Sequence, residues 1–127
     1  MAIRTELSLR LPNSPGALGR VAEILGEARI NLLALHLESS GRLRLIVDNP
    51  LHAAGALREA DQHVDERDVL YVVAPNAPGA LARVARLVSE AGINVDYAYG
   101  AAVEGGQMAA IIIGVADAQR AAAAAGL

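Results

Sequence analysis

Two stretches of the chain read almost alike: residues 12–32 are PNSPGALGRVAEILGEARINL, and residues 75–95 are PNAPGALARVARLVSEAGINV. The offset between them is 63 residues throughout, without a gap, and 13 of the 21 aligned pairs are identical. Two copies of this length account for nearly the whole chain of 127 residues, and a solenoid would need at least three repeats. The sequence therefore predicts two small domains, residues 1–67 and 68–127, packed together.

Each copy begins with a strand that leads into a helix. In the first copy, residues 6–11 place three leucines on one face, as a half-buried strand does: Leu7, Leu9 and Leu11. Apolar residues then recur at helical spacing over residues 18–28, and again over 81–91 in the second copy. Gly92 is expected to end the second helix. Arg29 holds the equivalent place in the first copy, where a left-handed backbone would cost about 1 kcal/mol.

The segment before each helix contains the residues that open helices. Pro15 and Pro78 suit the first helical position, because a missing N–H costs nothing there. We expect the side chain of Ser14 to cap the first helix. The second copy has alanine at that place, so we expect Asn76 to supply the acceptor instead.

The remaining elements complete a β-α-β-β-α order in each copy. The predicted strands are 30–38 and 42–48 in the first copy, and 93–103 and 107–115 in the second. A second helix follows in each, over 50–61 and from 116 onward. This order predicts an α+β fold of two ferredoxin-like (βαββαβ) units, with helices on one face of antiparallel sheets.

The last strand of each copy is the difficult one. Residues 63–67 are short and polar and run directly into a strand at 69–73, so one long strand would serve both sheets. The second copy has no clear last strand before Leu127. Because an unpaired sheet edge promotes association, we expect the first copy or another chain to cover this edge, as in a homodimer.

Composition excludes several classes of function. The formal charge is −3 and there are only three aromatic residues, which argues against a nucleic-acid partner. The absence of cysteine excludes thiolate chemistry, and three histidines without ligand spacing give no metal site: His36, His52 and His63. No apolar run reaches membrane-span length, and the start of the chain has no secretory h-region. We expect a soluble, cytoplasmic protein with no membrane contact.

No catalytic motif accompanies the repeat. The sequence has no Gly-x-Ser-x-Gly, no phosphate loop and no dinucleotide fingerprint, so we expect neither enzyme activity nor a cofactor.

The repeated strand–PNxPGAL–helix–IN–strand pattern resembles the ACT domain, and the whole chain resembles small stand-alone proteins made of two ACT domains. The resemblance implies a regulatory module that binds a free amino acid at an interface between two ACT domains. In such proteins the ligand lies against the loop between the first strand and the first helix. The resemblance also implies binding roles for an asparagine just before the motif and another after it, which match Asn13, Asn76, Asn31 and Asn94. A histidine found in some members is replaced here by Leu11 and Ala74.

The physical chemistry of the loops supports the same location. The first N–H groups of a helix have no partner within it and attract a carboxylate. Together with the four asparagines that the resemblance implies, the predicted ligand-binding residues are Asn13, Ser14, Gly16, Ala17, Leu18, Asn31, Asn76, Gly79, Ala80, Leu81 and Asn94.

Several of these residues have simpler interpretations. The four asparagines also suit turns and strand entries. Tyr97 and Tyr99 either pack on the sheet or line a pocket. Residues 32–37 are apolar on both faces, so another domain or subunit is expected to cover the second face.

Three functional hypotheses stay open. The first is an amino-acid sensor. The second is an interaction module that binds an enzyme of amino-acid metabolism through the apolar strand 32–37, and the third is an ACT-like scaffold that has lost its ligand.

Overall fold

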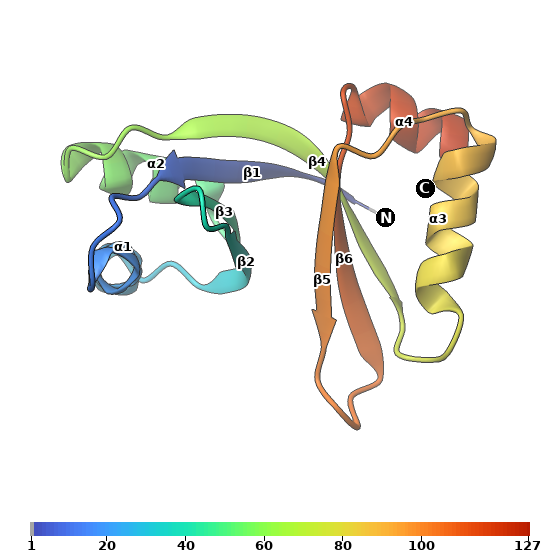
Figure 1. Ribbon diagram of the computed structural model, residues 1–127, viewed down its shortest axis with the longest axis horizontal. Helices are drawn as coiled ribbons and strands as arrows, with labels where there is room; N and C mark the ends of the chain where they lie inside the picture. The colour runs from blue at the N-terminus through green and yellow to red at the C-terminus, as the bar shows by residue number, and fades with distance from the viewer. Residues whose placement is uncertain (1) are drawn as a thin grey trace. The chain divides into compact units, whose positions relative to one another are not determined.

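The computed structural model describes residues 2–127, which form two compact units. The first unit is Thr5–Arg67, and the second is Asp68–Leu127 together with the start of the chain through Arg4. The six strands are β1 (Ala2–Arg10), β2 (Leu32–Leu37), β3 (Arg42–Val47), β4 (Asp65–Pro75), β5 (Tyr97–Ala102) and β6 (Met108–Gly114). They follow the order β2-β3-β1-β4-β6-β5, and β3 pairs antiparallel with β1 and β2, as β6 does with β4 and β5. In each unit both helices belong to one layer that packs on the sheet (Figure 1). This is the predicted α+β, ferredoxin-like arrangement.

The elements of the first unit follow the predicted order. They are β1 (Ala2–Arg10), α1 (Ala17–Glu27), β2 (Leu32–Leu37), β3 (Arg42–Val47) and α2 (Pro50–Glu59). Leucines that alternate along β1 and β3 pack against both helices in one core, which includes Leu7, Leu9, Leu43, Leu45, Val21, Leu25 and Leu57. The alternation in the sequence therefore identifies the buried face of the sheet correctly.

The second unit repeats this order. Its elements are β4 (Asp65–Pro75), α3 (Ala80–Glu90), β5 (Tyr97–Ala102), β6 (Met108–Gly114) and α4 (Ala118–Ala125). The alanine run near the end of the chain is helical, and four alanines of α4 are buried: Ala118, Ala121, Ala122 and Ala125. Small side chains let this helix approach the sheet closely, but each buries less apolar area than a leucine would.

The strand missing from the second copy comes from the start of the chain. β1 and β4 are neighbours in the strand order, and each passes from one unit into the other. Ile3 packs against the core of the second unit, and the guanidinium of Arg4 lies 4.8 Å from the ring centroid of Tyr71. The first residues of β4, Asp65–Arg67, correspondingly belong to the first unit. The long strand expected across residues 63–73 is thus β4, and β1 provides its counterpart.

The starts of α1 and α3 differ from the prediction. Both helices begin two residues after the proline, and the N-cap residues are Gly16 and Gly79, with φ of 87° and 86°. Neither N-cap makes a side-chain hydrogen bond, so the expected capping by Ser14 and Asn76 is wrong. A left-handed glycine turns the chain sharply into the helix, and no residue with a Cβ adopts this conformation without strain.

Among residues 2–127, no helix is both long and apolar enough to cross a membrane.

Arg29 lies in the left-handed region with φ of 60°, at the position that Gly92 occupies after α3 with φ of 73°. We predict that Arg29→Gly raises the free energy of unfolding by about 0.5–1 kcal/mol, because glycine removes the steric cost of this conformation. Urea unfolding followed by far-UV circular dichroism measures the change. Gly92→Ala is the matched control and should lower stability by a similar amount; a less stable Arg29→Gly variant contradicts the explanation.

Ile3 tests the contribution of the chain start to the second unit. We predict that Ile3→Ala lowers the free energy of unfolding by about 1–2 kcal/mol, less than for a fully buried isoleucine because Ile3 is only partly buried. Leu51→Ala provides the control, since Leu51 is 84% exposed and its removal should have little effect. Equal stability of Ile3→Ala and the unaltered protein would mean that β1 does not complete this core.

Candidate functional site

The candidate site is the turn that leads from the first strand of a copy into its first helix. In the second unit the N–H of Ala80 donates to the carbonyl oxygen of Ala77 at 3.2 Å, and the N–H of Arg83 donates to Gly79 at 3.0 Å. Ala80 is therefore not one of the free donors that the sequence suggested. In the described chain, the N–H groups of Gly79 and Leu81 have no hydrogen-bond acceptor. The N–H of Ala82 likewise has none, so the start of α3 offers three unpaired donors and the positive end of the helix dipole.

The first unit repeats this geometry. The N–H of Ala17 donates to the backbone carbonyl oxygen of Ser14 at 3.4 Å, and the N–H of Arg20 donates to the carbonyl oxygen of Gly16 at 2.9 Å. Ala17 is therefore also engaged within the turn. The corresponding unpaired donors in the described chain are the N–H groups of Gly16, Leu18 and Gly19.

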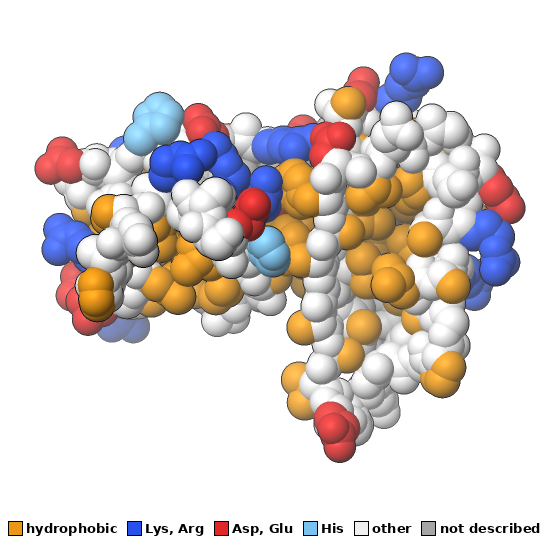
Figure 2. Space-filling model, in the orientation of Figure 1, with side chains coloured by type: hydrophobic (Ala, Val, Ile, Leu, Met, Phe, Trp, Pro, Cys, Tyr) orange, Lys and Arg blue, Asp and Glu red, His pale blue; other side chains and the backbone are white. Residues whose placement is uncertain are grey.

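A cavity of about 450 Å³ lies between the start of α3 and the β5–β6 hairpin, and we refer to it as the β5 cavity. Its lining residues are mostly small and apolar: Pro75, Asn76, Ala77, Ala80, Leu81, Ala98, Tyr99, Gly100, Ala101, Ala109, Ala110 and Ile111. Apolar side chains gather between α3 and β5 on the face shown in Figure 2. Asn76 and Tyr99 carry the only polar side chains among the lining residues.

Asn76 joins the turn before α3 to the tip of the hairpin. Its side-chain nitrogen Nδ2 donates to the carbonyl oxygens of Val103 at 3.3 Å and Gly106 at 2.9 Å. Its backbone N–H also donates to the carbonyl oxygen of Gln107 at 2.9 Å. Both side-chain partners are carbonyl oxygens, so these two bonds use only Nδ2 and leave the amide oxygen Oδ1 as an acceptor. Asn76 is also one of the residues that line the β5 cavity.

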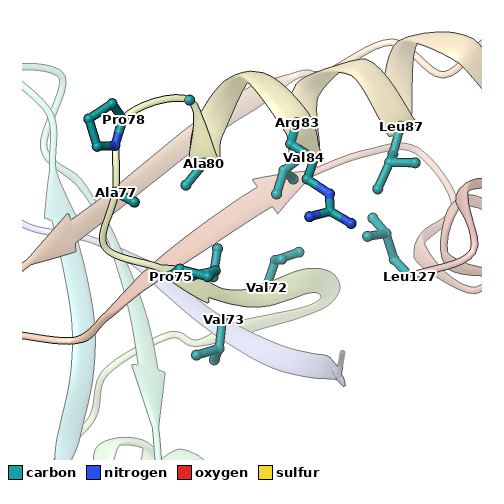
Figure 3. A pocket seen from close by; sticks show the side chains of 12 residues that line it. Val72, Val73, Pro75, Ala77, Pro78, Ala80, Arg83, Val84, Leu87 and Leu127 are labelled. Carbon is teal, nitrogen blue, oxygen red and sulfur yellow. The ribbon is translucent and has the colours of Figure 1, made fainter.

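A second cavity, of about 390 Å³, opens on the other side of α3 between this helix and β4, and we refer to it as the β4 cavity. Figure 3 shows the side chain of Arg83 extending from α3 toward the space beside Val72 and Leu127. Arg83 is the only charged lining residue, and no acidic or amide side chain lines this cavity. Its chemistry suits an anion with an apolar body.

The first unit has a cavity at the position equivalent to the β4 cavity. It measures about 350 Å³ and includes Ser14, Gly16, Ala17 and Arg20 among its lining residues. Another cavity of about 480 Å³ lies near the end of α1 and the start of α2, away from both loops, and has Leu51 and His52 among its lining residues.

The structure brings together only some of the residues predicted from the sequence. Asn76, Ala80 and Leu81 line the β5 cavity, and Gly79 and Ala80 line the β4 cavity. Four predicted residues line none of the four cavities described above: Asn13, Leu18, Asn31 and Asn94. The backbone of Asn31 is hydrogen-bonded to Asp48 at the entry to β2, where its N–H donates to Oδ1 at 3.1 Å and its carbonyl accepts at 3.1 Å.

Two features were not anticipated from the sequence. Ala98 and Gly100 on β5 line the β5 cavity, although neither belongs to a motif. Glu6 on β1 is 2% exposed and forms an ion pair with Arg44, which also contacts Glu38. The alternation along residues 6–11 places Glu6 opposite the leucine face, but its burial cannot be inferred from one strand.

One family model matches nearly the whole chain. The family model described as ACT domain pair matches residues 1–124. A crystal structure of protein BT0572 from Bacteroides thetaiotaomicron has a TM-score of 0.86 and 33% identity, covering 96% of this chain and 85% of that one. No curated protein matches the sequence.

Two aspartate kinase structures share the fold at lower identity. The regulatory subunit of aspartate kinase from Thermus thermophilus, in its ligand-free form, has a TM-score of 0.67 and 20% identity, covering 98% of this chain and 92% of that one. Aspartokinase III of E. coli, in complex with lysine and aspartate, has a TM-score of 0.58 and 19% identity, covering 94% of this chain and 29% of that one. The fold, the repeated loop and the match along 124 residues lead to one conclusion: this chain belongs to the family of ACT domain pairs.

Proposed function

We propose that this protein is a non-catalytic regulator that binds a free amino acid at the loop between the first strand and the first helix of an ACT domain. The observation that supports the proposal is the β5 cavity, an apolar space lined by Asn76 and by Leu81, whose backbone N–H is unpaired at the start of α3. The fold shared with an aspartate kinase regulatory subunit is consistent with a regulatory role.

The donors and acceptors suit a zwitterion. An α-carboxylate needs N–H donors, and the positive end of α3 has unpaired ones at Leu81, which lines the β5 cavity, and at Gly79, which lines the β4 cavity. An α-ammonium group needs an acceptor, which Oδ1 of Asn76 provides. The β4 cavity fits a zwitterion less well, because its only charged lining residue, Arg83, would repel the ammonium group.

Regulation requires that the ligand prefer one state of the protein. A bound amino acid shifts an equilibrium only by its difference in affinity for two arrangements of domains or subunits. The homodimer that we expect would bring a second ACT domain to the loop and supply the second arrangement. We place this activity in the cytoplasm, where free amino acids are synthesised.

Amino-acid binding predicts stabilisation against heat. A ligand at 100 times its dissociation constant adds about 2.7 kcal/mol, which should raise the unfolding midpoint by roughly 4–8 °C. A dye-based thermal shift measurement against each of the twenty amino acids at millimolar concentration tests this. A shift for one or two of them is expected; no shift for any amino acid contradicts the proposal.

Asn76→Ala tests the placement of the ammonium group. Loss of the acceptor should weaken binding of whichever amino acid gives the thermal shift by roughly tenfold or more, as for a hydrogen bond to a charged group. Asn13→Ala is the matched control in the first unit and should leave the affinity unchanged. Calorimetric titration of both variants with that amino acid measures the two affinities. If Asn76→Ala and Asn13→Ala bind it equally well, the ammonium group does not bind at Asn76.

A second candidate function is supported by β2. This strand ends the strand order, and three of its leucines are at least one-third exposed: Leu33, Leu35 and Leu37. An exposed apolar edge strand is suited to pairing with another protein, so an interaction module for an enzyme of amino-acid metabolism is the alternative. Recovery of such an enzyme with the unaltered protein, but not with Leu35→Glu, together with no amino-acid shift, would favour it.

A further inference from the structure

The two copies of the repeat differ at the strand that borders the candidate cavity. In the first unit Leu35 and Leu37 lie directly opposite Leu45 and Leu43 of β3, so all four side chains share the helix-covered face. The equivalent β5 residues are Ala98 and Gly100, which lie opposite Ile113 and Ile111. Leucine is thus replaced by much smaller residues at both β5 positions, while the partner strand keeps a large aliphatic residue.

Elsewhere on these strands a change of size is compensated. Ala34 lies opposite Ile46 in the first unit, whereas Tyr97 lies opposite Gly114 in the second. A Cβ at Gly114 would lie 2.3 Å from the ring carbon Cζ of Tyr97, so the ring occupies the space that the glycine leaves. A small residue on one strand is therefore matched by a large residue on the other.

No such compensation occurs at Ala98 and Gly100. Both residues line the β5 cavity, and the neighbouring helix residue Leu81 is 60% exposed. Its counterpart Leu18 is 38% exposed. The positions that carry leucine in the first unit therefore border an open apolar cavity in the second.

We propose that the β5 cavity binds the side chain of a branched aliphatic amino acid and that Ala98 sets the size of side chain admitted. This inference rests on the proposed function, because it assigns the ligand of the same loop. The first unit has the larger residues Leu35 and Leu37 at the equivalent positions, so we expect one bound amino acid per chain rather than two.

The chemistry of the cavity supports this class of ligand. No lining residue carries a charge, so the charged side chain of lysine, arginine, aspartate or glutamate would lose water without gaining a partner. Three lining residues surround an aliphatic group with methyl or larger apolar side chains: Ala80, Ala98 and Ile111. Leucine, isoleucine and valine combine a zwitterionic head for the helix start with an apolar branch for this space.

The test exchanges the residue that distinguishes the two copies. Ala98→Leu restores the side chain present in the first unit, at an exposed position on the end strand β5. We expect L-leucine, L-isoleucine and L-valine to bind the unaltered protein at one site per chain in calorimetric titrations. In Ala98→Leu the affinity for L-leucine should fall by roughly tenfold or more, while that for L-alanine stays within about threefold, because only the branch meets the new side chain.

Two further variants complete the test. Ala109→Val narrows the same cavity from β6 and should also reduce the affinity for L-leucine more than that for L-alanine. Leu35→Ala is the matched control in the first unit and should leave L-leucine binding unchanged. Thermal unfolding without ligand checks that each variant is folded.

The outcomes separate this inference from the proposed function. If the unaltered protein binds an amino acid but Ala98→Leu and Ala109→Val bind it equally well, the β5 cavity does not hold its side chain and the inference is overturned alone. A ligand with a charged side chain, or two sites per chain, also overturns it and leaves the proposed function intact. If no amino acid binds the unaltered protein, the proposed function and this inference both fail.

Discussion

Pairing of the backbone in the two central strands is the constraint on which the rest of the structure depends. A sheet edge with unpaired N–H and C=O groups promotes association, and each 63-residue copy is one strand short of a four-stranded sheet. β1 and β4 resolve this because each is long enough to contribute to both units. The apolar layers, the helices above them and the loops that start α1 and α3 all take their positions from these two strands.

The two units have similar cores but differ at their end strands, β2 and β5. The cores keep large aliphatic residues at equivalent strand positions, because interior packing tolerates little loss of volume. The end strands β2 and β5 differ more, and the leucines at two positions of β2 correspond to alanine and glycine on β5. A nearly identical loop therefore accompanies leucines on the end strand of one unit and lines a cavity with the end strand of the other.

Much of the architecture could be predicted from the sequence because its signals are local. The repeat, the alternation of Leu7, Leu9 and Leu11, and the helical spacing after each PGAL motif identified strands and helices within a few residues. The helix starts were misjudged, because the left-handed glycines Gly16 and Gly79 replace side-chain caps and this choice has no periodic signal. The use of residues 2–4 as a strand of the second unit joins segments more than sixty residues apart, which periodicity cannot reveal.

The candidate site was predictable only in part, for the same reason. The loop itself stands out because it is repeated, and Asn76 could be named from its motif. Its role as a link to Val103 and Gly106 depends on the length of the β5–β6 hairpin, and the cavity beside it depends on Ala98, which is conspicuous only when register aligns the two copies. A residue that is important because its side chain is small belongs to no motif, so a single sequence does not single it out.

The shared strands have a consequence for how the molecule responds to stress. Leu7 and Leu9 of β1 lie in the first core while Ile3 of the same strand packs on the second, and β4 likewise crosses the boundary at Arg67. Neither unit can unfold without withdrawing a strand from the other. The two halves should therefore melt in one cooperative transition. A cut after Arg67 would keep residues 5–67 in one fragment and leave residues 68–127 without the strand that the start of the chain supplies.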